Sequence, residues 1–133
     1  MKLSFITNLI ISKFIFLAIL GCSDSDDKSS SCTNRQMQLN ELRENIRAFA
    51  ETSICNDDFE CRFIAFGSKP CGGAWEYLIY TTSIDTLELT DMVNNFNSME
   101  ATYNMECGAI SDCLAVMPPT GFDCQNNICI PIY

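Results

Sequence analysis

Nine cysteines in a chain of 133 residues limit what this sequence can fold into more than any other feature. The cytosol keeps thiols reduced, and a small core gains much from crosslinks, so this cysteine content indicates disulfides in an oxidising compartment. The length leaves room for one small domain beside a targeting segment. We therefore expect an exported, disulfide-stabilised domain.

The first 21 residues have the layout of a cleavable signal peptide. Their only charges are two lysines, and the apolar run FIFLAIL at residues 14–20 stops just before Cys22. Seven apolar residues are too few to span a membrane. The alternative, an uncleaved anchor over residues 3–21, would place Lys13 and two polar side chains in the bilayer at a cost in free energy.

The end of this run, Ile19-Leu20-Gly21-Cys22, resembles the lipobox of bacterial lipoproteins, with Leu20 where a small residue is usual. The resemblance implies that the Cys22 thiol receives a diacylglyceryl group, that the chain is cut just before it, and that the new amino group is acylated. Several acyl chains would anchor the protein firmly, since each buried methylene contributes about 0.8 kcal/mol. The alternative is an ordinary signal peptide with Cys22 in a disulfide.

A polar segment follows the predicted lipidation site. Residues 23–31 read SDSDDKSSS and include no apolar side chain, so residues 22–31 are predicted to form a flexible tether ahead of a domain at 32–133. The acidic start of this segment resembles the surface-export signal of Bacteroidota lipoproteins. This resemblance implies an outer-membrane lipoprotein whose domain faces either the periplasm or the outside of the cell.

Without Cys22 the chain has an even number of cysteines, which suits complete pairing. These are Cys32, Cys55, Cys61, Cys71, Cys107, Cys113, Cys124 and Cys129. Eight cysteines allow 105 pairings, so their spacing does not give the connectivity. If the two predicted helices pack antiparallel, Cys32 lies near Cys107 and we expect them to bond. Cys129 has two candidate partners, Cys124 across a predicted hairpin and Cys61.

Two segments carry helical patterns. Thr33 and Gln36 fit a capping box for the first helix, and Asp85 with Glu88 fits one for the second, which Gly108 would end. The first helix has apolar residues at helical spacing: Leu39, Leu42, Ile46, Phe49 and Ala50. The second has the stripe Leu89, Met92, Val93, Phe96, Met99 and Tyr103.

The remaining regular segments are predicted to be strands. Residues 61–66 and 75–82 are rich in aromatic and branched side chains, residues 113–117 form a short run before two prolines, and residues 121–132 fit a hairpin that turns at Asn126-Asn127. Short connections favour antiparallel pairing. The predicted fold class is a small disulfide-rich α+β domain, with two helices packed on an antiparallel sheet of three to five short strands.

The loop GSKPCGG between the first two predicted strands is the candidate binding loop. Its glycines and proline allow unusual backbone conformations, and its cysteine can fix them through a disulfide. The candidate contact residues are Gly67, Ser68, Lys69, Pro70, Gly72 and Gly73. Lys69 is predicted to be the exposed side chain that a partner would contact. The alternative is a tight hairpin connection without a partner.

This loop is part of a third resemblance. Together with Tyr77-Leu78, Tyr80, Ser111-Asp112-Cys113 and the final cysteine pair, it resembles a group of small bacterial secreted or lipidated proteins. That group has no assigned activity, so the resemblance implies a family and no function.

Charge restricts the partners. From Cys22 onward, 17 acidic residues outnumber six basic ones, which gives a net charge of −11. Such a surface repels a phosphate backbone, which excludes nucleic acid and favours a cationic protein or peptide. The alternative is that acidity only keeps a surface protein soluble.

The residue types argue against catalysis and metal binding. The chain has no histidine, its thiols are committed to disulfides, and no C-x-x-C pair suits zinc or redox chemistry. The acidic segment NDDFE at residues 56–60 lacks the spacing of a calcium loop. Carboxylates such as Glu76 or Asp112 remain as a candidate acid and base. We expect no enzyme, cofactor or metal.

Two function classes follow. The first is a lipid-anchored, non-catalytic binding module, for example an inhibitor of a cationic hydrolase. The second is a structural or assembly component of the cell envelope, for which crosslinks and acidity give durability alone.

Overall fold

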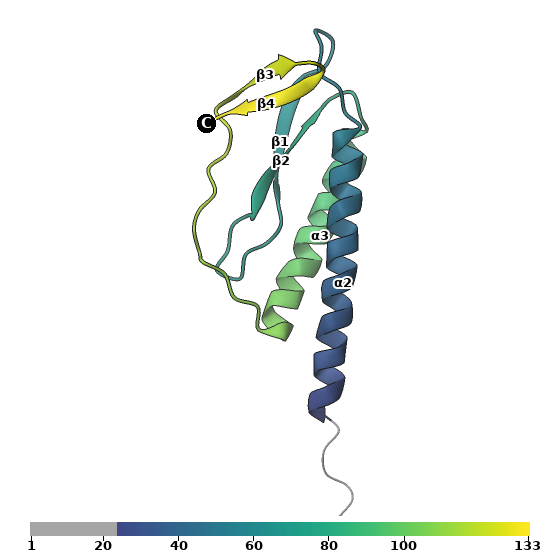
Figure 1. Ribbon diagram of the computed structural model, residues 1–133, viewed down its shortest axis with the longest axis vertical. Coiled ribbons are helices and arrows are strands. Elements are labelled where there is room, and N and C mark those ends of the chain that lie inside the picture. Colours follow the sequence, from purple (N-terminus) through teal and green to yellow (C-terminus); the bar gives the residue numbers. More distant parts are fainter. Residues whose placement is uncertain (1–23) are drawn as a thin grey trace, which may run out of the picture. The chain divides into compact units, whose positions relative to one another are not determined.

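The computed structural model describes residues 24–133, with side chains from residue 27 onward. The predicted signal peptide and the lipidation site at Cys22 lie outside the described residues. By the density of its contacts the chain divides into Met1–Ser31 and Cys32–Tyr133. Six elements follow one another: α2 (Asp24–Glu51), β1 (Cys61–Phe66), β2 (Glu76–Thr81), α3 (Thr86–Cys107), β3 (Gly121–Gln125) and β4 (Ile128–Ile132) (Figure 1). No helix of the described chain is both long enough and apolar enough to cross a membrane.

Helix α2 begins earlier than the sequence predicts. It starts at Asp24, so Thr33 lies inside the helix and is not its cap, and residues 24–31, predicted as part of the tether, are helical. This segment contains neither glycine nor proline, and its aspartates lie near the helix N-terminus, where negative charge is favourable. The polar composition that suggested a tether is therefore also compatible with a helix.

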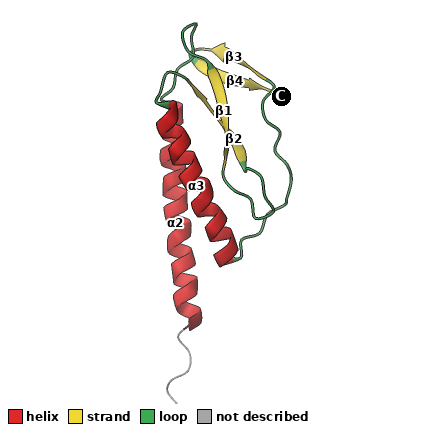
Figure 2. Cartoon of the chain, turned by 180° about the vertical axis from the view of Figure 1, so that it is seen from behind, coloured by secondary structure: helices red, strands yellow, loops and turns green. Residues whose placement is uncertain are grey.

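The hydrophobic core lies between the two helices and the inner face of β1–β2. Its buried residues are Leu39, Ile46, Ala50, Phe66, Leu78, Tyr80, Leu89, Val93 and Phe96. These include most of the apolar positions that the sequence assigns to the helix faces, and Leu42, Phe49, Met92 and Tyr103 pack against them. Met99 is an exception, because it is exposed while Glu100 beside it is buried. Figure 2 shows both helices on one side of the strands.

The ends of α3 are as predicted. The Asp85 carboxylate accepts hydrogen bonds from the backbone N–H groups of Leu87 and Glu88, and Gly108 closes the helix in the left-handed conformation. Cys107, the last residue of α3, is bonded to Cys32 in α2. The helices therefore pack with the predicted crosslink between them.

Four strands form two sheets instead of one. Strands β1 and β2 pair antiparallel from Cys61 with Thr81 to Phe66 with Glu76, and β3 pairs with β4 through a turn at Asn126 and Asn127. Both turn residues have positive φ, as the sequence predicts for this hairpin. The outer face of β1 carries Phe63, whose ring lies 6.2 Å from that of Phe122 in β3. The fold class is confirmed as a small disulfide-rich α+β domain.

Residues 109–120, which we call the strap, join α3 to β3. The strand predicted at 113–117 is absent, since no hydrogen-bonded partner runs beside this part of the described chain. Cys113 has a φ of 57°, a conformation that ends an extended run. The aliphatic pattern that predicted a strand belongs to side chains that are mostly exposed.

All eight cysteines of the Cys32–Tyr133 unit form disulfides. The pairs are Cys32–Cys107, Cys55–Cys124, Cys61–Cys129 and Cys71–Cys113. The predicted Cys32–Cys107 bond is confirmed, and of the two candidate partners Cys129 takes Cys61. Cys124 and Cys129 do lie opposite each other in the hairpin, as expected, but each is bonded to a residue outside it.

Candidate functional site

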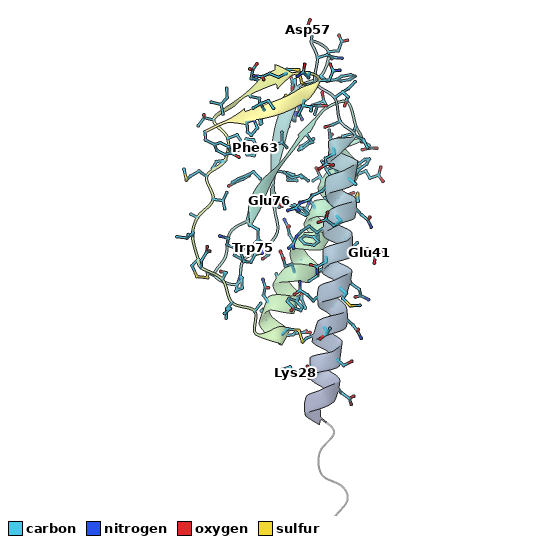
Figure 3. The ribbon with its side chains drawn as sticks, viewed as in Figure 1. Lys28, Glu41, Asp57, Phe63, Trp75 and Glu76 are labelled. Atoms are coloured by element: carbon cyan, nitrogen blue, oxygen red, sulfur yellow. A yellow bond between two sulfur atoms is a disulfide. The ribbon has the colours of Figure 1, made fainter. Side chains whose placement is uncertain are left out.

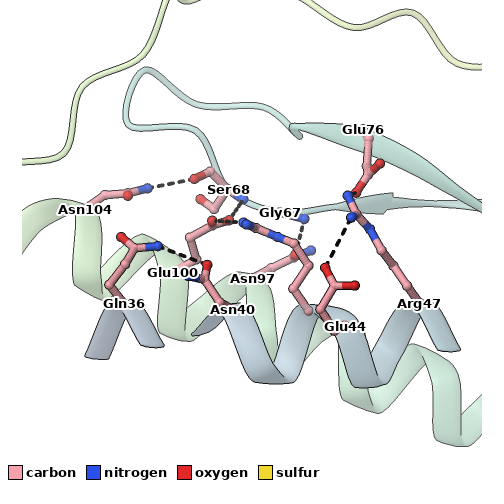
Figure 4. Close-up of polar contacts among 11 residues, drawn as sticks. Gln36, Asn40, Glu44, Arg47, Gly67, Ser68, Glu76, Asn97, Glu100 and Asn104 are labelled. Atoms are coloured by element: carbon pink, nitrogen blue, oxygen red, sulfur yellow. Dashed lines mark hydrogen bonds and ion pairs between the residues drawn. The ribbon is translucent and has the colours of Figure 1, made fainter. Parts of the chain in front are cut away.

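The candidate binding loop is fixed at its start by helix α3. The Gly67 N–H donates to Asn97 Oδ1 at 2.7 Å, and the Ser68 N–H donates to Glu100 Oε2 at 2.6 Å. Asn104 Nδ2 donates to the Ser68 carbonyl oxygen at 2.7 Å. These three α3 residues are spaced by three and four positions, so they lie on one helix face (Figure 4). The backbone at the start of the loop is therefore fixed to helix α3, whose apolar face packs in the core.

Lys69 is not the exposed contact residue that the sequence predicts. It is only 6% exposed, and its ammonium donates to Asp112 Oδ1 at 3.3 Å and to the carbonyl oxygen of Leu114. The nitrogen also lies 5.1 Å from the centre of the Trp75 ring. A lysine ammonium has three donors, and the strap and the indole together satisfy it here. Lys69 therefore fastens the strap to the loop and does not face a partner.

The tip of the loop remains exposed but well ordered by local bonds. Pro70, Cys71, Gly72 and Gly73 are exposed. The Gly72 N–H donates to the Lys69 carbonyl oxygen, and the Lys69 N–H donates to that of Gly73, both at 2.9 Å. The Cys71–Cys113 disulfide ties the tip to the strap. This tip is the part of the candidate binding loop that a partner could contact.

Asp112 is the acidic residue of the strap. It accepts a hydrogen bond from the Leu114 N–H at 3.1 Å as well as from Lys69. The Leu114 N–H and, second to it, the Lys69 ammonium lower the pKa of Asp112 below its ordinary value. The strap is thus fixed by one ionised carboxylate, one ammonium and one disulfide.

A polar pocket of about 440 Å³ lies beside the loop, between α2, α3 and the start of β2. Its lining residues are Gln36, Arg43, Arg47, Trp75, Glu76, Glu100, Asn104, Ala109 and Ile110. Figure 3 shows Trp75 and Glu76 on the same stretch of chain, where the loop leads into β2. The pocket therefore joins residues from both helices, β2 and the strap.

Two ion pairs cross this pocket. Arg43 Nη2 lies 2.5 Å from Glu100 Oε1, and Arg47 Nη2 lies 2.6 Å from Glu76 Oε1. The hydrogen bond to Glu76 raises the pKa of Arg47 above its ordinary value. With two guanidinium groups and two carboxylates, the pocket carries no net charge.

The two carboxylates considered as acid and base have separate partners. Glu76 pairs with Arg47 in the pocket, whereas Asp112 pairs with Lys69 and does not line that pocket. Among the described residues, the one grouping with metal-ligand atoms close together is Cys55, Cys61 and Cys129, with sulfurs within 4.8 Å of one another. These sulfurs are bonded in disulfides and so are not thiolates.

Of the pocket residues, Glu100 is the one whose role is indicated by its position in the sequence. Glu100 follows Leu89, Val93 and Phe96 at helical spacing, so it occupies a core-facing position. A charged residue at such a position indicates a buried ion pair. Arg43, Arg47 and Trp75 carried no comparable signal, because their positions do not distinguish a pocket from an exposed surface.

No protein-family model, no curated protein and no solved structure matches this chain.

Proposed function

We propose that this chain is an outer-membrane lipoprotein, anchored through lipid on Cys22, whose domain binds a cationic protein without catalysing a reaction. The observation that carries the proposal is the state of the basic residues. The unit Cys32–Tyr133 has five, and each lies within ion-pair distance of a carboxylate: Arg35, Arg43, Arg47, Arg62 and Lys69. Their positive charge is therefore locally neutralised.

The carboxylates greatly outnumber these bases. Eight of them make no ion pair with any described residue: Glu41, Glu51, Asp57, Asp58, Asp85, Glu88, Asp91 and Asp123. They come from both helices, a loop and β3, and Figure 3 shows Glu41 and Asp57 on widely separated parts of the unit. The unpaired charge is negative on several faces, which favours encounter with a positively charged protein.

Rigidity supports a binding role. The Cys71–Cys113 disulfide and local backbone hydrogen bonds hold the loop tip before any partner arrives, and hydrogen bonds from α3 hold the start of the loop. A surface that is already ordered loses little conformational entropy on binding. The exposed tip at Pro70–Gly73 is the part of the candidate loop that we assign to contact.

The alternative is a structural or assembly component of the envelope. The same crosslinks would then serve durability, and the acidity would serve solubility. The two proposals differ in one respect, since only the first requires a soluble cationic ligand.

Capture from envelope extract and secretions separates the two proposals. The full-length chain, purified in mild detergent, is immobilised and exposed to these mixtures at low salt and at about 1 M salt, where screening reduces the Debye length to about 3 Å. The binding-module proposal predicts one basic protein that is retained at low salt and lost at high salt. Retention of nothing above background would contradict it and favour the structural component.

A pair of variants with matched chemistry completes the test. Replacing Asp57, Asp58 and Glu88 by their amides removes unpaired charge, and we expect capture to fall. Replacing both Glu60 and Arg62 by glutamine removes an exposed ion pair and leaves the net charge unchanged, so capture should persist. Equal capture by both variants would contradict an electrostatic mechanism.

A further inference from the structure

The polar pocket is a candidate site for a small molecule. Its volume of about 440 Å³ falls in the range of about 300–1,000 Å³ common for ligand sites. Residues from four separate elements converge on it: Gln36, Arg43 and Arg47 from α2, Glu100 and Asn104 from α3, Trp75 and Glu76 where the loop joins β2, and Ala109 and Ile110 from the strap.

The charges in the pocket indicate a neutral ligand. Both guanidinium groups are paired with carboxylates, Arg43 with Glu100 and Arg47 with Glu76. An anionic ligand would lie against these carboxylates, and a cationic one against the guanidinium groups. Either would be attracted by one member of each ion pair and repelled by the other, whereas an uncharged ligand meets no such repulsion.

The pocket also offers free hydrogen-bonding atoms of both kinds. Gln36 Oε1, Glu76 Oε2 and Asn104 Oδ1 accept no hydrogen bond from any described residue, and Arg43 uses one of its nitrogens. Every buried side-chain nitrogen or oxygen in the described chain has a partner, so these acceptors are reached by solvent. A hydroxyl group both donates and accepts, so a ligand with several hydroxyls matches this mixture.

The rest of the lining is apolar. Trp75 is 37% exposed, and Ile110, with Ala109 beside it, is 91% exposed. Apolar side chains with a few polar groups are typical of sites that fix the orientation of a small ligand. A methyl group and the C–H surface of a ring would suit this wall.

We propose that this pocket binds a neutral sugar of the N-acetylated hexosamine class. The hydroxyls of such a sugar match the free acceptors and guanidinium N–H groups, and its acetamido methyl matches the wall of Trp75, Ala109 and Ile110. This proposal is independent of the binding of a cationic protein, which depends on the outer surface of the domain.

The tryptophan provides the assay. Trp75 is the only tryptophan of the chain and lines the pocket, so emission excited selectively from tryptophan reports on this side chain. We would titrate the full-length, oxidised protein in detergent with the neutral disaccharide of N-acetylglucosamine and expect a saturable change in emission. Absence of a saturable change, or stronger binding of glutamate or putrescine at equal concentration, would overturn the proposal.

Two matched substitutions on α2 locate the site. Gln36→Ala removes a hydrogen-bonding side chain from the pocket and should weaken binding of the disaccharide about five- to tenfold. Gln38→Ala makes the same chemical change at a position outside the pocket, and affinity should be unchanged. Equal affinities for both variants would show that the sugar binds elsewhere and would overturn the assignment.

Discussion

Gly67 and Gly73 have the same positive φ in different surroundings. Both have a φ of 84°, but a Cβ atom at Gly67 would lie 2.5 Å from Trp75 Cδ1, whereas one at Gly73 would meet nothing within 4 Å. An alanine at Gly73 therefore pays only for its positive φ, about 1–2 kcal/mol. An alanine at Gly67 has the same strain and also has to displace the indole.

We expect Gly67→Ala to lower the free energy of unfolding by at least about 1 kcal/mol more than Gly73→Ala, because overpacking adds about 1–3 kcal/mol. Urea unfolding of both variants with the disulfides intact, followed by Trp75 fluorescence, gives the two values. Equal losses would show that the indole does not pack against the Gly67 backbone.

Glu100 is the other residue on which the loop depends. It is 6% exposed and bonds both Arg43 and the Ser68 N–H. Removing one partner of a buried pair leaves the other charge uncompensated, and the remaining exposure of Arg43 reduces this cost. We expect Glu100→Ala to lower the free energy of unfolding by about 2–3 kcal/mol and to speed hydrogen exchange at Ser68.

Glu41→Ala is the matched control for this change. Glu41 is exposed and makes no ion pair with the described residues, so its loss should change stability by less than about 0.5 kcal/mol. If the two variants lose the same stability, Glu100 does not hold the loop.

Among the elements, the strap depends most on single contacts. It has no regular secondary structure and is attached through the Cys71–Cys113 disulfide and the contacts of Lys69 with Asp112 and Leu114. The pKa of Asp112 is lowered in the folded chain, so its ionised form stabilises the attached strap. This contribution is present above the ordinary value of 3.8 and is lost as the pH falls through the lower folded pKa.

We therefore expect the Asp112 carboxyl and the Leu114 amide to titrate together in an NMR experiment, with a midpoint below 3.8. In Lys69→Gln the midpoint should rise but stay below that value, because the Leu114 N–H is the larger cause. A midpoint at or above 3.8 in the unmodified chain would contradict the described attachment of the strap.

The features that the sequence predicts depend on contacts between near neighbours in the chain, and those that it misses depend on contacts between distant residues. The cap at Asp85, the end of α3 at Gly108 and the turn at Asn126-Asn127 depend on bonds to near neighbours, and the sequence predicts all three. The environment of Lys69 depends on Asp112 and Leu114, more than 40 positions away in the chain. No local pattern contains that contact, so the sequence predicts an exposed lysine and a strand where the structure has a buried lysine and a strap.

The pocket also depends on contacts between residues that are distant in the chain. Its residues come from four elements, and the packing of the helices on β1–β2 brings them together. The apolar spacing predicts that the helices pack on the strands, but it predicts neither the angle between these elements nor the depth of the pocket that they form. Glu100 was predictable as a core-facing charge, whereas Arg43 and Trp75 were not, because either side chain is equally compatible with an exposed surface.

At the scale of the whole molecule, the disulfides compensate for small sheets. A two-stranded sheet is marginally stable by itself, and the unit contains two of them. Three of the disulfides join residues 68 to 75 positions apart, and a loop of that size contributes about 4 kcal/mol in the chain-entropy model. The bonds therefore join the two helices to each other, β1–β2 to β3–β4, and the candidate binding loop to the strap, while the hydrophobic core holds the helices on β1–β2.

The proposed lipid anchor depends on the same pairing. If all eight cysteines from Cys32 onward bond with one another, Cys22 has no partner among them and its thiol remains for acylation. The disulfide pattern and the anchor are therefore linked, and one experiment on the mature protein tests both.

That experiment is peptide mapping by mass spectrometry under non-reducing conditions, on protein purified from membranes. We predict four linked peptide pairs, which join Cys32 to Cys107, Cys55 to Cys124, Cys61 to Cys129 and Cys71 to Cys113, together with a lipid-modified peptide that begins at Cys22. A bond between Cys124 and Cys129, free thiols among these eight, or Cys22 in a disulfide would contradict the account.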